Sequence, residues 1–266
     1  MVPTMGALHA GHVTLISRAA AENDQAVVSI FVNPSQFGNA GDLARYPRDF
    51  DGDVAKAVSA GASVVYAPDV ATVYPTGFAT WIEPGPLAAA WEGKSRPGHF
   101  RGVATVVSIL LNTVRPDRAY FGEKDFQQLQ VIRRMHQDLR LPGRIVASPT
   151  VRDMDGLALS SRNARLSADG RMVARRIPLA LAEIAEVAQS GVRANAELEK
   201  IGRQVLVHPG LRLDYLAIVD ADTLELASET LRERRVLVAA EVDGVRLIDN
   251  ISLPALADGA QPHAAS

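Results

Sequence analysis

The chain has 266 residues, of which 47% are hydrophobic and 22% charged, and 28 basic residues nearly balance 30 acidic ones, giving a formal net charge of −2. This balance argues against a nucleic-acid surface, the lack of cysteine excludes disulfides and thiolate chemistry, and no apolar run approaches the ~20 residues that span a membrane. We expect a cytoplasmic globular protein that binds neither nucleic acid nor membranes, since its start lacks the pattern of a signal peptide.

Short β-branched runs alternate with helical patterns in the first half of the chain. Strands are predicted at 26–34, 63–68, 117–122 and 144–151, after a short opening strand at MVPT. Helices are predicted at 13–23, 53–61, 103–114 and 126–139. This rhythm indicates an α/β domain with a mostly parallel sheet. Because strands average about five to six residues, we expect leading sequence to be missing before MVPT.

The second half has a different pattern. One long helix is predicted at 167–191, capped by Ser167, and a second at 194–207. Three strands follow, at 213–220, 235–242 and 245–253, and Asp243-Gly244 predicts a tight hairpin between the last two. We therefore expect a catalytic domain at 1–150, a smaller α+β domain at 151–256, and a disordered tail at 257–266.

The segment MVPTMGALHAGH places His9 and His12 three positions apart, after a strand and at the start of a helix. Three interpretations are open. In the first interpretation the two histidines bind zinc, but a zinc site needs three or four ligands. The histidines can instead be turn and cap residues without chemistry. In the third interpretation, unpaired N–H groups at the helix start and an imidazole bind a phosphate and stabilise charge in the transition state.

The HAGH of residues 9–12 resembles the HxGH signature of an adenylyl-transferring superfamily with Rossmann-like catalytic domains. Its wider context, PTMGALHAGH, resembles the pantothenate synthetase (pantoate–β-alanine ligase) family. Five further blocks resemble that family in order: VSIFVNPSQFG (28–38), YPR (46–48), RPGHFRGV (96–103), RPDRAYFGEKDFQQL (115–129) and VRDMDGLALSSRN (151–163). The resemblance implies a Rossmann-like nucleotidyltransferase domain and weakens after about residue 165.

A set of residues in these blocks is implied to bind ATP. Those with catalytic roles are His9, His12 and Lys124, with Lys124 on the phosphates and His12 as a proton donor. The loop at 158–163 is expected to close over ATP and exclude water from a labile acyl adenylate. The implied ATP-binding residues are Met5, Gly6, His9, Gly11, His12, Gly122, Glu123, Lys124, Asp125, Val151, Leu159, Ser160, Ser161 and Arg162.

Neutral amides are implied to bind the second substrate. Gln36 and Gln128, with Asn33 nearby, are expected to hold pantoate, and Gln36 to face β-alanine as well. An amide orients a carboxylate without the strong ion pairing that would reduce its nucleophilicity. Without the resemblance, Gln128 would be interpreted as an exposed helix residue, and Asn33-Pro34 equally as simple turn chemistry. His99 is assigned no chemistry.

An acidic run, Asp49, Asp51 and Asp53, has oxygen ligands of the kind that Mg²⁺ prefers, but Gly52 interrupts it where relatives often carry an acid. We therefore predict that the protein itself holds no metal ion and that Mg²⁺ arrives bound to ATP. The resemblance implies ATP-dependent condensation of (R)-pantoate with β-alanine through pantoyl adenylate, by a homodimer. The alternatives are a related nucleotidyltransferase that moves AMP onto a phosphate acceptor, and a non-catalytic nucleotide-binding protein.

Overall fold

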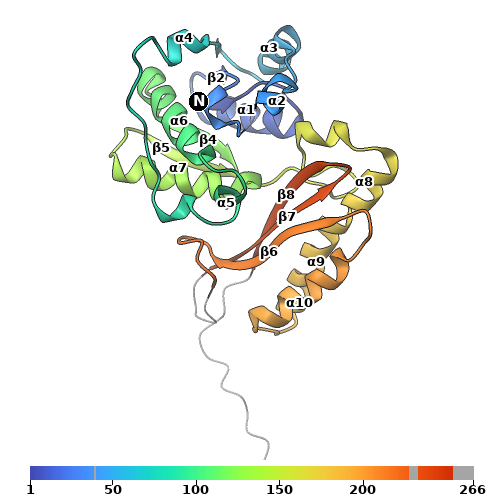
Figure 1. Cartoon of the computed structure of the whole chain (residues 1–266). Helices are drawn as coiled ribbons and strands as arrows, with labels where there is room; N and C mark the ends of the chain where they lie inside the picture. Colours follow the sequence, from blue (N-terminus) through green and yellow to red (C-terminus); the bar gives the residue numbers. More distant parts are fainter. Residues whose placement is uncertain (39, 228–232, 254–266) are drawn as a thin grey trace, which may run out of the picture. The chain divides into compact units, whose positions relative to one another are not determined.

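The computed structural model describes residues 1–38, 40–227 and 233–253 (Figure 1). The chain divides into two compact units, Met1–Asp153 with Ala158–Ser161, and Met154–Leu157 with Arg162–Ser266. It passes between them within the segment 153–162. The predicted disordered tail, 257–266, lies outside the described residues.

The first unit contains five parallel strands in two sheets, one of three strands and one of two. Strand β2 (Val27–Ile30) pairs with β1 (Val2–Thr4) on one side and β3 (Val64–Tyr66) on the other, and β4 (Arg118–Gly122) pairs with β5 (Arg144–Ser148). Two hydrogen bonds join the sheet of β1 to the sheet of β4. The Met1 amine donates to Arg118 O at 2.7 Å, and Tyr120 N–H donates to Met1 O at 2.9 Å. The resulting order 3-2-1-4-5 is that of a Rossmann-like sheet, which confirms the predicted fold class.

Helices surround this sheet. The longer ones are α1 (Ala10–Glu22), α3 (Phe50–Ser59), α6 (His99–Val114) and α7 (Phe126–Asp138). Helix α6 is buried along much of its length, because its apolar residues run around most of its circumference. The short helices are α2 (Ala40–Ala44), α4 (Val70–Val73) and α5 (Glu92–Ser95), with 3₁₀ turns η1 (Pro34–Gln36), η2 (Pro86–Ala88) and η3 (Glu123–Asp125).

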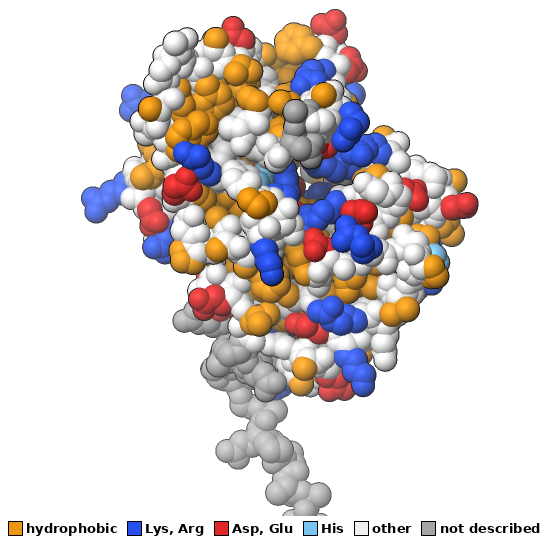
Figure 2. Space-filling view, in the orientation of Figure 1, with side chains coloured by type: hydrophobic (Ala, Val, Ile, Leu, Met, Phe, Trp, Pro, Cys, Tyr) orange, Lys and Arg blue, Asp and Glu red, His pale blue; other side chains and the backbone are white. Residues whose placement is uncertain are grey.

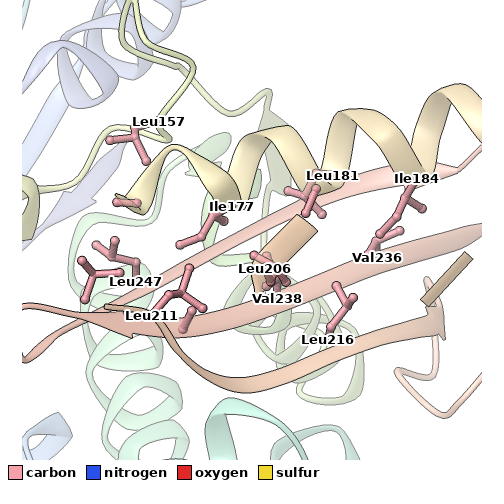
Figure 3. Close-up of a cluster of buried hydrophobic side chains, with 14 of the residues drawn as sticks. Leu157, Ile177, Leu181, Ile184, Leu206, Leu211, Leu216, Val236, Val238 and Leu247 are labelled. Atoms are coloured by element: carbon pink, nitrogen blue, oxygen red, sulfur yellow. The ribbon is translucent and has the colours of Figure 1, made fainter. Parts of the chain in front are cut away.

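The second unit packs helices on an antiparallel sheet. Its sheet order is β6 (Arg212–Asp220), β7 (Arg234–Val242) and β8 (Val245–Leu253), and both central residues of the β7–β8 turn, Asp243 and Gly244, have positive φ as a two-residue hairpin requires. Figure 3 shows side chains of α9 (Arg176–Gln189) directed at apolar side chains of the sheet. The other helices are η4 (Ser161–Arg165), α8 (Ala168–Ala174) and α10 (Asn195–Leu206).

The long helix predicted at 167–191 is wrong, because the structure breaks it at Arg175 into α8 and α9. Pro178 explains the break. It lacks the N–H that would bond to the carbonyl of Ala174, and its ring would clash with that carbonyl. Ala174 is accordingly the last residue of α8. The predicted cap is confirmed, since the Ser167 hydroxyl accepts from Gly170 N–H at 2.9 Å.

Among the described residues, none of the helices is both long and apolar enough to cross a bilayer. On the face drawn in Figure 2, acidic and basic side chains are interspersed with apolar ones. An anionic ligand must therefore be held by a local arrangement of donors rather than by the overall charge of the chain.

Close packing in the second unit gives a test of its core. A Cβ added at Gly202 of α10 would overlap the side chains of Ile184 and Leu216. Gly202→Ala should therefore lower the free energy of unfolding by about 1–3 kcal/mol, measured by urea denaturation. Gly38→Ala is the control, because a Cβ there meets nothing within 4 Å. Equal stability of the two variants would show that α10 does not pack as described.

Candidate active site

The predicted site residues of the first unit follow the carboxyl ends of neighbouring parallel strands. Met5 to His12 follow β1, Asn33 to Gln36 follow β2, Gly122 to Asp125 end β4 and begin the next turn, and Val151 follows β5. Since β1 lies between β2 and β4, these segments share one edge of the sheet. Open α/β sheets bind their ligands at this edge.

The turn after β1 is held by a buried carboxylate. Asp53, from α3, is 1% exposed, and its two oxygens accept hydrogen bonds from Ala7 N–H and Leu8 N–H, each at 2.7 Å. Gly6 has φ of +77°, and a Cβ there would lie 2.7 Å from Asp53 Oδ2. The turn therefore requires glycine at position 6 for both its backbone conformation and the space beside Asp53. Nothing in the acidic run of the sequence indicates this role of Asp53, because the turn that it holds is distant in the chain.

His9 and His12 form a capping box at the start of α1. The His9 ring accepts from Gly11 N–H at 3.2 Å through Nδ1, and the His12 ring accepts from His9 N–H at 3.3 Å through Nδ1. The ring centroids are 4.1 Å apart. Because each Nδ1 is an acceptor, we assign the proton of each neutral ring to Nε2. Each ring uses Nδ1 as an acceptor in the cap and keeps its Nε2–H as a donor. The same residue can therefore cap the helix and bind a ligand.

Both imidazoles are neutral near pH 7. Burial lowers the pKa of His12 to about 3, with a further contribution from the neighbouring His9. Burial also lowers the pKa of His9, and the positive charge of Lys124 acts in the same direction. The pair therefore offers hydrogen-bond donors rather than full positive charges in the free protein. A bound polyphosphate would raise both pKa values.

Lys124 brings a positive charge to the histidine pair from the end of β4. It lies in η3, and its Nζ is 3.9 Å from Asp125 Oδ2. His9 and His12 follow β1 and Lys124 follows the neighbouring strand β4, and the charges of Lys124 and Asp125 act on the pKa values of both histidines. The structure therefore brings together the three residues that were predicted to be catalytic. A flexible ammonium beside two imidazole donors can neutralise charge on a phosphate.

Gln36 is the last residue of η1, which follows β2, and Asn33 caps that turn; both side chains are buried. Asn33 Nδ2 donates to Gln36 Oε1 at 3.1 Å and to Gly102 O at 3.2 Å. Gln36 Nε2 then donates to Met5 Sδ at 2.9 Å. Asn33 is therefore committed to protein contacts, while Gln36 keeps an amide N–H directed toward the segment after β1.

Two adjacent glutamines of α7 have different environments. Gln127 is 4% exposed and donates to Leu87 O and Ala90 O, at 2.8 and 2.9 Å, while its Oε1 accepts from Glu92 N–H at 2.9 Å. It ties the segment 87–92 to α7. Gln128 is half-buried, and its side chain has no hydrogen bond to the residues that the structure describes. Of the two, only Gln128 has an amide that is not bonded to the described protein, and its assignment to pantoate stays a prediction.

The segment after β5 returns toward the histidine pair. Leu159 N–H donates to Val151 O at 3.0 Å, and Arg152 forms a bridge with Ala158. Leu159 Cβ lies 3.9 Å from the position of a Cβ at Gly11, so Leu159 packs against the start of α1. Ser160 and Ser161 follow directly. Arg162, the next residue, belongs to the second unit.

The acidic run after YPR does not form a cation site. Asp49 caps α3 by accepting from Gly52 N–H at 3.1 Å, and both oxygens of Asp53 are bonded to the turn after β1. In the described part of the chain, no group of three or more His, Asp or Glu side chains is arranged to hold a metal ion. These carboxylates therefore serve local structure.

A 3-2-1-4-5 parallel sheet with donors gathered at its carboxyl edge defines an α/β nucleotide-binding protein. Residues 1–252 match the family model described as pantoate-beta-alanine ligase. A pantothenate synthetase of Rubrobacter xylanophilus is 49% identical over 263 residues, covering 96% of this chain and 90% of that one. The chain therefore belongs to the pantoate–β-alanine ligase family, a family of ligases, and the resemblance noted in the sequence is confirmed.

Two solved structures of the family agree with this fold. The crystal structure of pantothenate synthetase from Thermus thermophilus is 51% identical, with a TM-score of 0.90, and covers 94% of this chain and 91% of its own. The ligase from Francisella tularensis, complexed with beta-gamma ATP and beta-alanine, is 38% identical, with a TM-score of 0.76, and covers 94% and 87%.

The neutral state of His12 predicts how stability depends on pH. An unfolded histidine has a pKa near 6.5, whereas the folded His12 stays neutral down to about pH 3. Between these values the unfolded chain binds more protons, so stability is fully present above pH 6.5 and is lost as the pH falls. His12→Asn removes this titration, while its amide oxygen can take over the Nδ1 acceptor role.

The measurement is urea denaturation of both proteins at pH 7.5, 6 and 5. The loss of stability between pH 7.5 and pH 5 should be smaller in His12→Asn than in the wild type. A parallel pH dependence in the two proteins would mean that His12 is not held neutral by burial.

Proposed function

We propose that this chain joins (R)-pantoate to β-alanine in two steps driven by ATP, through pantoyl adenylate, with release of pyrophosphate and AMP. Its family membership supports the overall reaction, and so does the relative solved in complex with beta-gamma ATP and beta-alanine. The observation that carries the mechanism is that His9, His12, Lys124 and the Gln36 amide follow neighbouring parallel strands at one edge of the sheet, with Gln36 Nε2 bonded to Met5 in the turn after β1.

In the first step, a carboxylate oxygen of pantoate attacks the α-phosphorus of ATP. A bond forms between that oxygen and the phosphorus, and the bond to the bridging oxygen breaks, so that pyrophosphate leaves with the electron pair. The Nε2–H groups of His9 and His12 would donate to phosphate oxygens, with His12 the proton donor implied by the resemblance. Lys124 supplies the positive charge that the neutral imidazoles lack.

Pantoate must be held without losing its nucleophilic charge. We assign its binding to the amides of Gln36 and Gln128, and we assign Asn33 to the support of Gln36 because its own amide is already bonded to protein. An amide N–H orients a carboxylate by a neutral hydrogen bond, which draws less charge from it than an arginine pair would. Gln36 is also the residue proposed to face β-alanine.

In the second step, the β-alanine amine attacks the carbonyl carbon of the adenylate. The carbon–nitrogen bond forms, the bond to the AMP oxygen breaks, and the amine nitrogen loses a proton. Water would compete with the amine for the same carbon. We propose that Leu159, Ser160 and Ser161 exclude it, and that Arg162 contributes a donor to ATP as the resemblance implies. Val151 is proposed to lie against the adenine.

Mg²⁺ enters this proposal as part of MgATP, the substrate. In the acidic run, both oxygens of Asp53 and one oxygen of Asp49 are already bonded to backbone N–H groups, which supports a metal carried by the phosphates rather than by this run. Gly6 and Gly11, with Gly122, Glu123 and Asp125, are proposed to line the ATP site. A homodimer, which the family resemblance implies, and a cytoplasmic location are further proposals.

A substrate matrix separates this function from the two alternatives. AMP release is measured with pantoate alone, with β-alanine alone and with both, and we expect steady turnover only with both. Without β-alanine, pantoate-dependent exchange of labelled pyrophosphate into ATP should still occur. Transfer of AMP to a phosphate acceptor would favour a nucleotidyltransferase, and binding of ATP without either reaction would favour a non-catalytic protein.

Removal of Lys124 should slow adenylate formation. Lys124→Ala should reduce pantoate-dependent pyrophosphate exchange by about 100-fold or more, because the phosphate charge is then left uncompensated during attack. Lys200→Ala, at an exposed position on α10, is the matched control and should exchange at the wild-type rate. If both variants exchange alike, Lys124 has no part in the first step.

A further inference from the structure

Gln36 offers a donor whose direction is set by its neighbours. Its side chain is buried, and Oε1 accepts from Asn33 Nδ2, so the NH₂ group must face the other way. There one N–H meets Met5 Sδ, a weak acceptor, and the other has no acceptor among the described residues. A buried N–H of this kind is positioned for a ligand oxygen.

The orientation of the Asn33 amide is set by several neighbours together. Its Nδ2 faces Gly102 O, which can only accept, and its Oδ1 faces Ser35 N–H, which can only donate, at 3.3 Å. A reversed amide would place donor against donor and acceptor against acceptor. Asn33 therefore presents a donor to Gln36, and this contact turns the Gln36 NH₂ group outward.

Tyr74 holds the acceptor end of Asn33. Its hydroxyl donates to Asn33 Oδ1 at 2.8 Å from 41 residues away, and the Ser35 hydroxyl donates to the same oxygen at 2.8 Å. Burial raises the pKa of Tyr74, so the phenol keeps its proton and remains a donor. The Tyr74 ring is stacked on Trp81, with centroids 5.7 Å apart, and meets Phe78 edge-on at 5.0 Å.

We propose that Tyr74 is a positioning residue that acts through Asn33 to direct the Gln36 N–H donor at the carboxylate or hydroxyl oxygens of the substrate acid. The inference rests on the proposed role of Gln36 and adds a residue outside the blocks from which the substrate residues were predicted. Tyr74 itself touches no substrate in this arrangement. Tyr74 keeps the Gln36 amide in one of its two flipped orientations. The two orientations have nearly the same shape, but the donor NH₂ group and the acceptor oxygen exchange places.

A double-mutant cycle tests this relay. Tyr74→Phe removes only the hydroxyl and keeps the aromatic packing, while Gln36→Ala removes the donor. Pantoate KM, ATP KM and kcat are measured for the wild type, both single variants and the double variant. Tyr66→Phe is the matched control, because no hydrogen bond of its hydroxyl is found in the described part of the chain.

Tyr74→Phe should raise pantoate KM about three- to ten-fold, as expected for loss of one hydrogen bond from an orienting network, and leave ATP KM unchanged. The double variant should bind pantoate no more weakly than Gln36→Ala alone, because Tyr74 has nothing left to orient. Tyr66→Phe should match the wild type. A thermal midpoint measured for each variant separates this effect from loss of folded protein, which lowers activity without changing KM.

Two results would overturn the inference in distinguishable ways. If Gln36→Ala raises pantoate KM but Tyr74→Phe leaves it unchanged, or if the two effects multiply in the double variant, Tyr74 does not act through Gln36 and the proposed function of Gln36 survives. If Gln36→Ala itself leaves pantoate KM at the wild-type value, the assignment of Gln36 to the acid is lost together with the role of Tyr74.

Discussion

The candidate site depends on how the turn after β1 satisfies its own backbone N–H groups. Asp53 accepts from the two amides in the middle of the turn, and the Nδ1 atoms of His9 and His12 accept from amides at the start of α1. Each imidazole is therefore fixed through one nitrogen and keeps a proton on the other. The same contacts that cap the helix thus set the tautomer and the direction of the donors.

Parallel strand order explains why this turn meets the other groups. The carboxyl ends of parallel strands lie at one edge, and β1 is flanked by β2 and β4. The histidine pair therefore follows the strand that lies between those leading to Gln36 and Lys124, although these residues are far apart in the chain. Lys124 is near enough for its charge to lower the histidine pKa values, which favours neutral donors in the free protein.

Much of this arrangement could be predicted from the sequence, for identifiable reasons. Alternating strand and helix patterns indicate a parallel sheet, and HAGH at a strand–helix junction indicates the site. The sequence did not reveal that Asp53 holds a turn 46 residues away, or that Tyr74 reaches Asn33 across 41 residues, because such contacts depend on tertiary packing. The break before α9 was missed although Pro178 was visible, because alanine-rich helical periodicity continued on both sides of it.

A neutral network has a chemical consequence for a reaction of this kind. An arginine would hold a carboxylate more strongly than an amide does, but it would also stabilise the charge that must attack phosphorus. A single amide N–H leaves the carboxylate charge available for attack on phosphorus. The N–H group selects the substrate only if the direction of the N–H bond is fixed. The aromatic packing of Tyr74 and the saturated amide of Asn33 provide that rigidity without adding a charge. In the proposed arrangement, precise orientation by neutral groups takes the place of ionic binding at the acid, and positive charge is kept for the phosphates.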